Sequence, residues 1–251
     1  MLKRKLDKQY GNFLKTSQYF YKHYIQRLAA CFGLPELHRV VEGIKLEKMT
    51  ITDAIPEPPS DLPDAVLKSC HQTLIHLGDL SRYRAQARQK VPTYEAALTY
   101  YGLAHDLIPN SGFAHHQMGI VYLDDRKHLE IIYHFYRAWA IKQPHPNAKQ
   151  NLESEFKTLL VPNAPARRSG PADPQEPFIA WFGKLHAHLY KGEPFAQHQE
   201  LEDEVIHRLV MASKAPNTAD MLLKMVLVNI ASYHVASGKL RGRYPVLWKY
   251  E

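Results

Sequence analysis

A helix-turn-helix pattern of about 34 residues occurs twice between Leu74 and Pro144, and this repeat constrains the fold more than any other feature of the chain. The pattern places small or aromatic residues at fixed positions, so that neighbouring helices can approach closely. A single helix pair cannot bury its own apolar face, and successive pairs therefore stack on one another. We expect stacked helix pairs with a concave surface suited to peptides. The first copy contains Gly78, Ala97, Tyr101, Ala104 and Pro109, and the second contains Met118, Gly119, Tyr122, Phe135, Ala138 and Pro144.

Apolar residues recur at helical spacing along most of the chain, and no segment alternates as a strand would. Short connections favour antiparallel packing of successive helices. The sequence therefore predicts an all-α fold, an antiparallel helical array with tetratricopeptide-like repeats followed by further helical hairpins. Tyr19, Phe20 and Tyr21 are expected in the core. The expected helices cover residues 12–32, 64–88, 93–107, 111–123, 127–142, 147–160, 177–191, 196–213 and 218–237.

Proline-rich segments divide the chain. Residues 50–63 are acidic and rich in proline, which predicts a surface loop. A second group of prolines at 162–177 predicts a linker or a long loop. We therefore expect one helical domain over residues 1–161 and a helical-hairpin domain over residues 178–251, joined by this linker.

The composition favours an intracellular protein with an acidic partner. The net charge of +7 suits a phosphopeptide or a nucleic acid without choosing between them. Cys31 and Cys70 are too few for a disulfide framework, and the start of the chain has no apolar run typical of a signal peptide. The most apolar stretch, residues 221–236, is interrupted by Lys224 and is short for a membrane span. It is expected to be a buried helix, with no membrane involved.

The motifs of common catalytic sites are missing. The sequence has no glycine loop for nucleotides and no nucleophile elbow. It contains 15 His, but the HExxH zinc motif is absent and the closest His residues do not share a helix face. Asp124 and Asp125 are expected in the turn between two repeat helices, as capping groups. We expect no enzyme activity, no metal and no cofactor.

The helix expected at 127–142 carries a candidate phosphate-binding site at Arg137 and Tyr133. A guanidinium presents a planar fork of donors that matches two phosphate oxygens, and a tyrosine hydroxyl one turn earlier adds a further donor. In the alternative interpretation, Arg137 pairs with Glu130 or Glu95 across the stack. Spacing alone leaves both interpretations open. The helix has Leu129, Ile132, Phe135 and Trp139 on its apolar face and Glu130, Tyr133, His134 and Arg137 on the opposite face.

Other basic residues are candidates for an accessory role. Arg82 and Arg84 lie near Asp79, where they form either an anion-binding patch or ion pairs that keep adjacent helices in register. The second role is favoured for Asp79. Lys3 and Lys5 belong to a basic cluster at the start of the chain, and a terminal charge run of this kind is most often solvated.

The sequence resembles a known family in three segments: HLGDLSRYR, LIPNSGFAHHQMGIVYLDDRKHLEIIYHFYRAWAIKQPHPNAKQNLESEF and FIAWFGKLHAHLYKG. They are similar to the family that joins the telomerase-associated ever-shorter-telomeres protein to the SMG adaptors of nonsense-mediated mRNA decay. The similarity runs from about Leu6 to Ala236. It implies an N-terminal 14-3-3-like domain containing tetratricopeptide-type helix pairs, followed by a helical-hairpin domain.

The resemblance also implies binding of phosphoserine or phosphothreonine in the RNA helicase that drives decay. The family's phosphate-binding Arg falls on Arg137, within FYRAWAIKQPHPNAKQNL. A second basic residue of the family, a Lys on an early helix, has no match, and Lys3 or Lys5 would be poor substitutes. The family has a further helix before NFLKTSQYFYKHYIQRL and a longer C-terminal region, so both domains are expected to be truncated.

Two functions follow from these observations, beside a third interpretation in which the chain is a purely structural helical module. The leading hypothesis is a non-enzymatic adaptor of the nucleus and cytoplasm that binds the phosphorylated RNA helicase and other decay factors, or a telomerase-associated protein. The alternative is a nucleic-acid-binding subunit of a telomerase or mRNA-decay ribonucleoprotein, which binds telomerase RNA or another single strand through Arg82, Arg84, Arg167 and Arg168.

Overall fold

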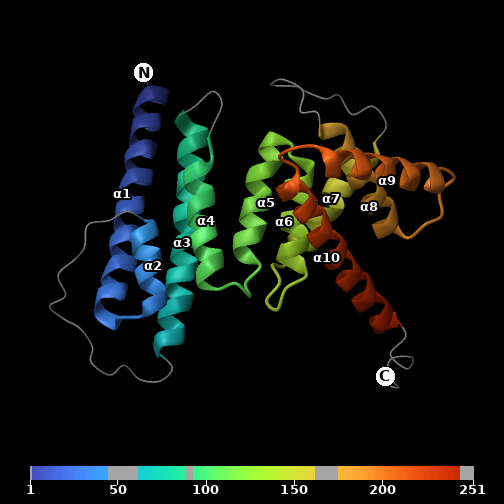
Figure 1. Cartoon of the computed structure of the whole chain (residues 1–251). Coiled ribbons are helices and arrows are strands. Elements are labelled where there is room, and N and C mark those ends of the chain that lie inside the picture. The colour runs from blue at the N-terminus through green and yellow to red at the C-terminus, as the bar shows by residue number, and fades with distance from the viewer. Residues whose placement is uncertain (1, 45–61, 89–92, 162–174, 244–251) are drawn as a thin grey trace. The chain divides into compact units, whose positions relative to one another are not determined.

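The computed structural model of the chain describes residues 2–44, 62–88, 93–161 and 175–243. Within these ranges the regular elements are ten α-helices without a β-strand, which confirms the predicted all-α class (Figure 1). Most of the expected loop and of the expected linker, together with Arg167 and Arg168, lie outside the described residues. The helices are α1 (Leu2–Phe32), α2 (Pro35–Gly43), α3 (Leu62–Arg88), α4 (Glu95–Leu107), α5 (Phe113–Asp125), α6 (His128–Trp139), α7 (Ala148–Leu160), α8 (Glu176–Lys191), α9 (His198–Lys214) and α10 (Ala219–Arg243).

The first two helices differ from the prediction. α1 begins at Leu2, well before the expected start at residue 12, and α2 was not predicted at all. Gly33 has a positive φ of 58°, a conformation that suits glycine and reverses the chain after α1. Pro35 stands in the first turn of α2, where a backbone N–H has no acceptor within the helix. The lack of an N–H in proline therefore costs no hydrogen bond there. The same Gly33 and Pro35 that end α1 therefore also start a second, short helix.

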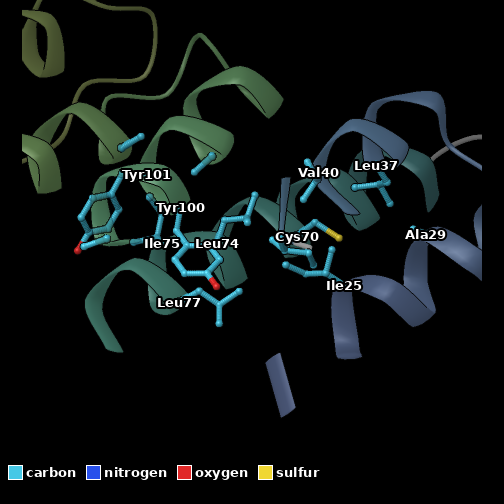
Figure 2. Packing of buried hydrophobic residues seen from close by; sticks show 14 of the residues in the cluster. Ile25, Ala29, Leu37, Val40, Cys70, Leu74, Ile75, Leu77, Tyr100 and Tyr101 are labelled. Atoms are coloured by element: carbon cyan, nitrogen blue, oxygen red, sulfur yellow. The ribbon is translucent and has the colours of Figure 1, made fainter. Parts of the chain in front are cut away.

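The described residues form two compact units, Met1–Val121 and Tyr122–Glu251. In the first unit α3 packs against α1 and α4, and α2 packs against the same two helices. Figure 1 shows α1, α3 and α4 side by side. The core between them is drawn in Figure 2, and its most buried members include Ile25, Leu37, Cys70, Leu74, Leu77 and Tyr101.

The first repeat copy packs as its pattern predicts. A Cβ atom on Gly78 would lie 2.2 Å from Cε1 of Tyr101, so the tyrosine ring occupies the space that any larger residue at 78 would fill. The Tyr101 hydroxyl donates a hydrogen bond of 2.7 Å to Oδ1 of Asp79. A small residue on α3 and an aromatic one on α4 thus fit together and fix the distance between the two helices.

In the second unit α6 packs against α7, α8 and α10, and α8 also packs against α7 and α9. Helices from both sides of residues 162–174 therefore share one compact unit. The predicted division into domains at 161 and 178 stays a prediction. The unit's buried side chains include Ile131, Ile132, Phe135, Tyr136, Leu152 and Phe182.

The expectation for the aromatic residues of α1 was wrong. Tyr19 and Phe20 are 66% and 62% exposed, and only Tyr21 packs against the core. α1 buries a different face, which carries Leu14 and Ile25.

The expectation of a buried α10 was wrong for one side of that helix. Met221, Met225 and Val228 are buried, whereas Ile230 and Tyr233 are 60% and 75% exposed. By length and composition Ala219–Gly238 would suffice to cross a membrane, but one such helix is weak evidence for a span. Polar side chains of α10 instead contact α6 and α8, as described below.

Candidate functional site

α6 presents one narrow polar stripe to solvent. Between Leu129 and Ala138 only Glu130, Tyr133 and Arg137 are partly exposed, and the other side chains are buried. Spacings of three and four residues place these three on one face of the helix. The stripe follows the sequence prediction except at His134, which is buried at 7% exposure.

Arg137 is half-buried, and its Nε atom is buried without a hydrogen-bond partner among the described residues. Leaving a buried donor of a charged group unpaired is costly, so such groups usually have a partner. Arg137 therefore keeps one donor that no described residue satisfies. Among the described residues, Nε of Arg82 in the first unit is likewise buried without a hydrogen-bond partner, although Nη2 of Arg82 pairs with Asp79.

Glu130 does not pair with Arg137. Nζ of Lys224 on α10 donates to Oε1 of Glu130 at 2.6 Å and to Oδ2 of Asp220 at 2.7 Å. The alternative pairing of Arg137 with Glu130 is therefore not realised. Pairing with Glu95, which belongs to the other unit, stays a prediction.

Aromatic rings hold the middle of the stripe. The ring of Tyr122 stacks on that of His134 with centroids 5.4 Å apart, and Tyr133 meets the same imidazole edge-on at 4.9 Å. Nε2 of His134 lies 3.8 Å from Oε2 of Glu130. These contacts restrict the side chains that line the stripe to few rotamers. Less conformational entropy of these side chains is then lost when a ligand binds.

Two pKa values reflect the charges near the stripe. Burial alone would lower the pKa of Lys224, but its hydrogen bonds to Asp220 and Glu130 outweigh burial and leave that pKa raised. Burial, with the nearby Glu130 carboxylate, raises the pKa of Tyr122. Both groups therefore keep their usual protonation state at neutral pH, with Lys224 charged and Tyr122 neutral.

A second polar contact ties α10 to α8. Nε2 of His186 and Oδ1 of Asn229 lie 2.8 Å apart, and His186 is 3% exposed. Burial lowers the pKa of His186 to about 4, against a smaller opposite effect of the hydrogen bond to Asn229. His186 is therefore neutral at physiological pH and acts as the hydrogen-bond donor that joins α8 to α10.

Arg82 and Arg84 lie in the first unit, and both are engaged. Nη2 of Arg82 lies 3.3 Å from Oδ1 of Asp79, and Nη1 of Arg84 donates to Oε1 of Gln18 at 3.2 Å. Because Asp79 also accepts from Tyr101, it links α3 to α4, which agrees with the structural role favoured for it. The structure brings neither arginine into the same unit as Arg137.

Lys3 and Lys5 are exposed near the start of α1 and belong to the first unit as well. Asp124 and Asp125 are the last two residues of α5 instead of lying in a turn, because α5 continues to Asp125. The expectation of capping groups in a turn was therefore wrong. Among the described residues, no group of three or more His, Cys, Asp or Glu could hold a metal ion.

Sequence reasoning missed the role of Lys224. It stands out only as a charge within an apolar helix, and its partner Glu130 is far away in the sequence. A second feature that sequence could not locate is a small hollow at the α8–α9 connection, lined by His188, Gly192, Pro194, Phe195 and His198. It does not include the stripe on α6, so the predicted peptide groove stays a prediction.

Comparison with known proteins gives consistent similarities. The family model for the Est1 DNA/RNA binding domain matches residues 97–245, and the model for telomerase activating protein Est1 matches residues 1–88. The chain is 28% identical to nonsense-mediated mRNA decay factor SMG7 of Danio rerio over 228 residues, which are 88% of this chain and 18% of that protein. It is 30% identical to telomere elongation protein est1 of Schizosaccharomyces pombe over 159 residues, which are 60% of this chain and 32% of that protein.

A solved structure shares the fold. The structure described as "Crystal structure of Est1 and Cdc13" superposes with a TM-score of 0.71 over 92% of this chain and 49% of that chain, at 15% identity. Identity at this level supports the fold alone. The chain spans less than a third of the length of the two curated relatives named above.

Proposed function

Because this chain belongs to the Est1 family, we propose that it is a non-enzymatic adaptor that binds phosphoserine or phosphothreonine peptides through Arg137. The partner is the phosphorylated RNA helicase of nonsense-mediated mRNA decay, or a component of telomere maintenance. Both pathways are represented among the similar proteins. The protein acts in the nucleus and cytoplasm, where these pathways operate.

The observation that carries the proposal is the state of Arg137. Its side chain is partly exposed, its Nε is buried without an acceptor, and the nearest acidic residue of the stripe is already paired with Lys224. A phosphate group offers the forked acceptor that such a guanidinium lacks. In this proposal Tyr133, which lies one turn earlier on the same face, adds its hydroxyl to the phosphate contact.

The test compares a phosphoserine peptide with its unmodified twin by fluorescence anisotropy. Hydrogen bonds to charged groups contribute about 1.5–3 kcal/mol, so Arg137→Ala is expected to weaken the phosphopeptide roughly 10- to 100-fold. The unmodified peptide should be little affected. Arg137→Lys should recover only part of the loss, since an ammonium lacks the planar fork.

Arg39→Ala, which removes an exposed arginine from α2, is the matched control and should leave both affinities unchanged. Equal losses for the two peptides in Arg137→Ala would contradict a phosphate contact at this residue.

A second candidate function is binding of single-stranded nucleic acid, and the description of the family model over residues 97–245 favours it. Such binding releases counterions, so affinity for an oligonucleotide should fall steeply between two salt concentrations and be independent of peptide phosphorylation. The arginines first suggested for this role are less suited to it, because Arg82 and Arg84 are engaged with Asp79 and Gln18.

A further inference from the structure

One face of α1 carries four basic side chains in a row. We define the α1 basic row as Arg4, Lys8, Lys15 and Lys22. At about 3.6 residues per turn their positions differ by no more than about 40° around the helix axis, and they span about 27 Å along it. Arg4, Lys8 and Lys15 are exposed, and Lys22 is half-buried. α1 therefore presents a straight line of positive charge to solvent.

The charges of the α1 basic row are not neutralised by the described residues. α1 holds seven Lys and Arg residues against the single Asp7, which gives the helix a net charge of +6. Asp7 lies on another face, about 100° around the helix from Lys8. Among the residues that the structure describes, no side chain of the row pairs with a carboxylate, and Nζ of Lys22 lies 5.8 Å from the centre of the Tyr100 ring on α4. The row therefore keeps its charge for an anionic partner.

An exposed aromatic ring stands between the charges of the row. Tyr19 follows Lys15 by four residues and precedes Lys22 by three, so its side chain belongs to the same face of α1. It is 66% exposed. The imidazole of His23 lies against the Tyr19 ring with centroids 3.9 Å apart, and Nδ1 of His23 donates a hydrogen bond of 2.8 Å to the carbonyl oxygen of Tyr19. The imidazole thus holds the Tyr19 ring in place while most of that side chain stays open to solvent.

This combination of charge and ring selects one kind of polyanion. Proteins that bind single strands combine basic side chains along the phosphate backbone with aromatic rings on which unpaired bases stack. A duplex keeps its bases paired and stacked inside, so it would offer the row phosphates but no base for Tyr19. A phosphopeptide or an anionic membrane likewise has no base. An exposed, fixed ring between the charges therefore favours a single-stranded nucleic acid.

We propose that the α1 basic row and Tyr19 form a binding face for single-stranded nucleic acid. Lys8 and Lys15 contact phosphates of the strand, and Tyr19 stacks on a base. This inference rests on the second candidate function only in requiring that the chain binds a single strand. It assigns the strand to the first unit and to a helix outside residues 97–245, which match the model for the DNA/RNA binding domain.

The first experiment tests the stacking. It measures binding of the full chain to a labelled thymidine oligonucleotide of about 12 nucleotides and to its abasic twin, which has the same phosphates and no bases. Tyr19→Ala should weaken the thymidine strand about fivefold or more and leave the abasic twin unchanged, because only the first can stack. Tyr19→Phe keeps the ring and should retain the wild-type affinity. Phe20→Ala removes a ring that is 62% exposed on another face of α1 and should affect neither strand.

The second experiment tests the charges through the salt dependence. Each phosphate contact of a single strand contributes about 0.7 to the slope of log affinity against log salt concentration. Lys8→Gln with Lys15→Gln should therefore lower the magnitude of that slope by about 1.4. Arg39→Gln with Lys68→Gln removes two exposed charges from α2 and α3 and should leave the slope as in the wild type. Circular dichroism should show equal helicity for all variants.

The outcomes separate this inference from the candidate function. A wild-type chain that binds neither oligonucleotide contradicts both. If the wild type binds the thymidine strand, and the variants at Tyr19, Lys8 and Lys15 bind it as tightly with the same slope, the α1 face is refuted and the candidate function stands. Equal losses for the thymidine and abasic strands in Tyr19→Ala would overturn the stacking. Tighter binding of a duplex of the same length would show that charge alone is recognised, which also overturns the proposal.

Discussion

Gly78 is the residue on which the packing of α3 against α4 depends most directly. A Cβ atom there would overlap the Tyr101 ring at 2.2 Å, and neither the backbone of α3 nor the buried ring can move away without cost. Overpacking of this kind typically costs about 1–3 kcal/mol. We therefore expect Gly78→Ala to lower the free energy of unfolding by roughly that amount in urea titrations.

Gly102, in the middle of α4, provides the matched control. No atom lies within 4 Å of the position that its Cβ would take. Replacing a helical glycine by alanine without a clash stabilises a helix by about 0.5–1 kcal/mol. Gly102→Ala should therefore raise stability, and the opposite signs of the two variants separate the clash from the intrinsic preference for alanine. If both variants stabilise the protein, the close approach of Tyr101 to Gly78 is refuted.

Asp79 is the acceptor shared by α3 and α4. Without its carboxylate, the Tyr101 hydroxyl and the Arg82 guanidinium lose a buried partner, which costs about 1–3 kcal/mol for each unsatisfied group. Asp79→Ala should therefore destabilise the protein. Tyr101→Phe should cost much less stability in the Asp79→Ala variant than in the wild type, because in that variant the hydroxyl has already lost its acceptor. A double-mutant cycle measured by urea unfolding gives the coupling. Strict additivity would mean that the hydrogen bond contributes nothing.

At the scale of the helix, His186 on α8, hydrogen-bonded to Asn229 on α10, makes the folding stability sensitive to pH. The folded protein holds the pKa of His186 at about 4, below the ordinary value of 6.5, because the ring is buried. Between pH 6.5 and 4 the unfolded chain binds a proton that the folded chain does not, so the folded state loses stability as pH falls. The loss should be about 1.4 kcal/mol for each pH unit in this window.

His186→Gln, which keeps a donor for Asn229 but cannot titrate, should flatten the slope of unfolding free energy between pH 6.5 and 5. His198→Gln is the control, since that imidazole is half exposed. The pKa of His71 is also lowered by burial, so a smaller slope of the same sign should remain. An unchanged slope in His186→Gln would show that this imidazole titrates normally in the folded protein.

Helices were predictable from the sequence where the signal is local. The repeat of small and aromatic residues located α3 to α6, and the apolar period located α7 to α10 within a few residues. The spacing of Glu130, Tyr133 and Arg137 also gave the polar stripe of α6 correctly, because residues on one helix face are fixed by the helical period alone. The early start of α1 and the short helix α2 were missed although their signals are local. The other failures depend on distant partners. Periodicity cannot tell which of two apolar faces on α1 is buried, and nothing near Glu130 in sequence reveals that Lys224 neutralises it.

At the scale of the whole molecule, the positive charge is concentrated instead of being spread over the surface. α1 holds a net charge of +6 in a chain of net +7. Charges closer together than a Debye length of about 8–10 Å act jointly on a polyanion, whereas scattered ones are screened from each other. α1 should therefore dominate the attraction of the protein to any extended anionic surface.

Retention on a heparin column tests this distribution. Replacing Lys5, Lys8 and Lys15 by Gln removes three charges from α1, and replacing Lys127, Lys142 and Lys157 removes three exposed charges from the second unit. The net charge falls equally in the two variants. Because only the first set belongs to one dense cluster, its variant should elute at a clearly lower salt concentration. Equal elution of the two variants would mean that net charge, and not the basic helix α1, governs association with polyanions.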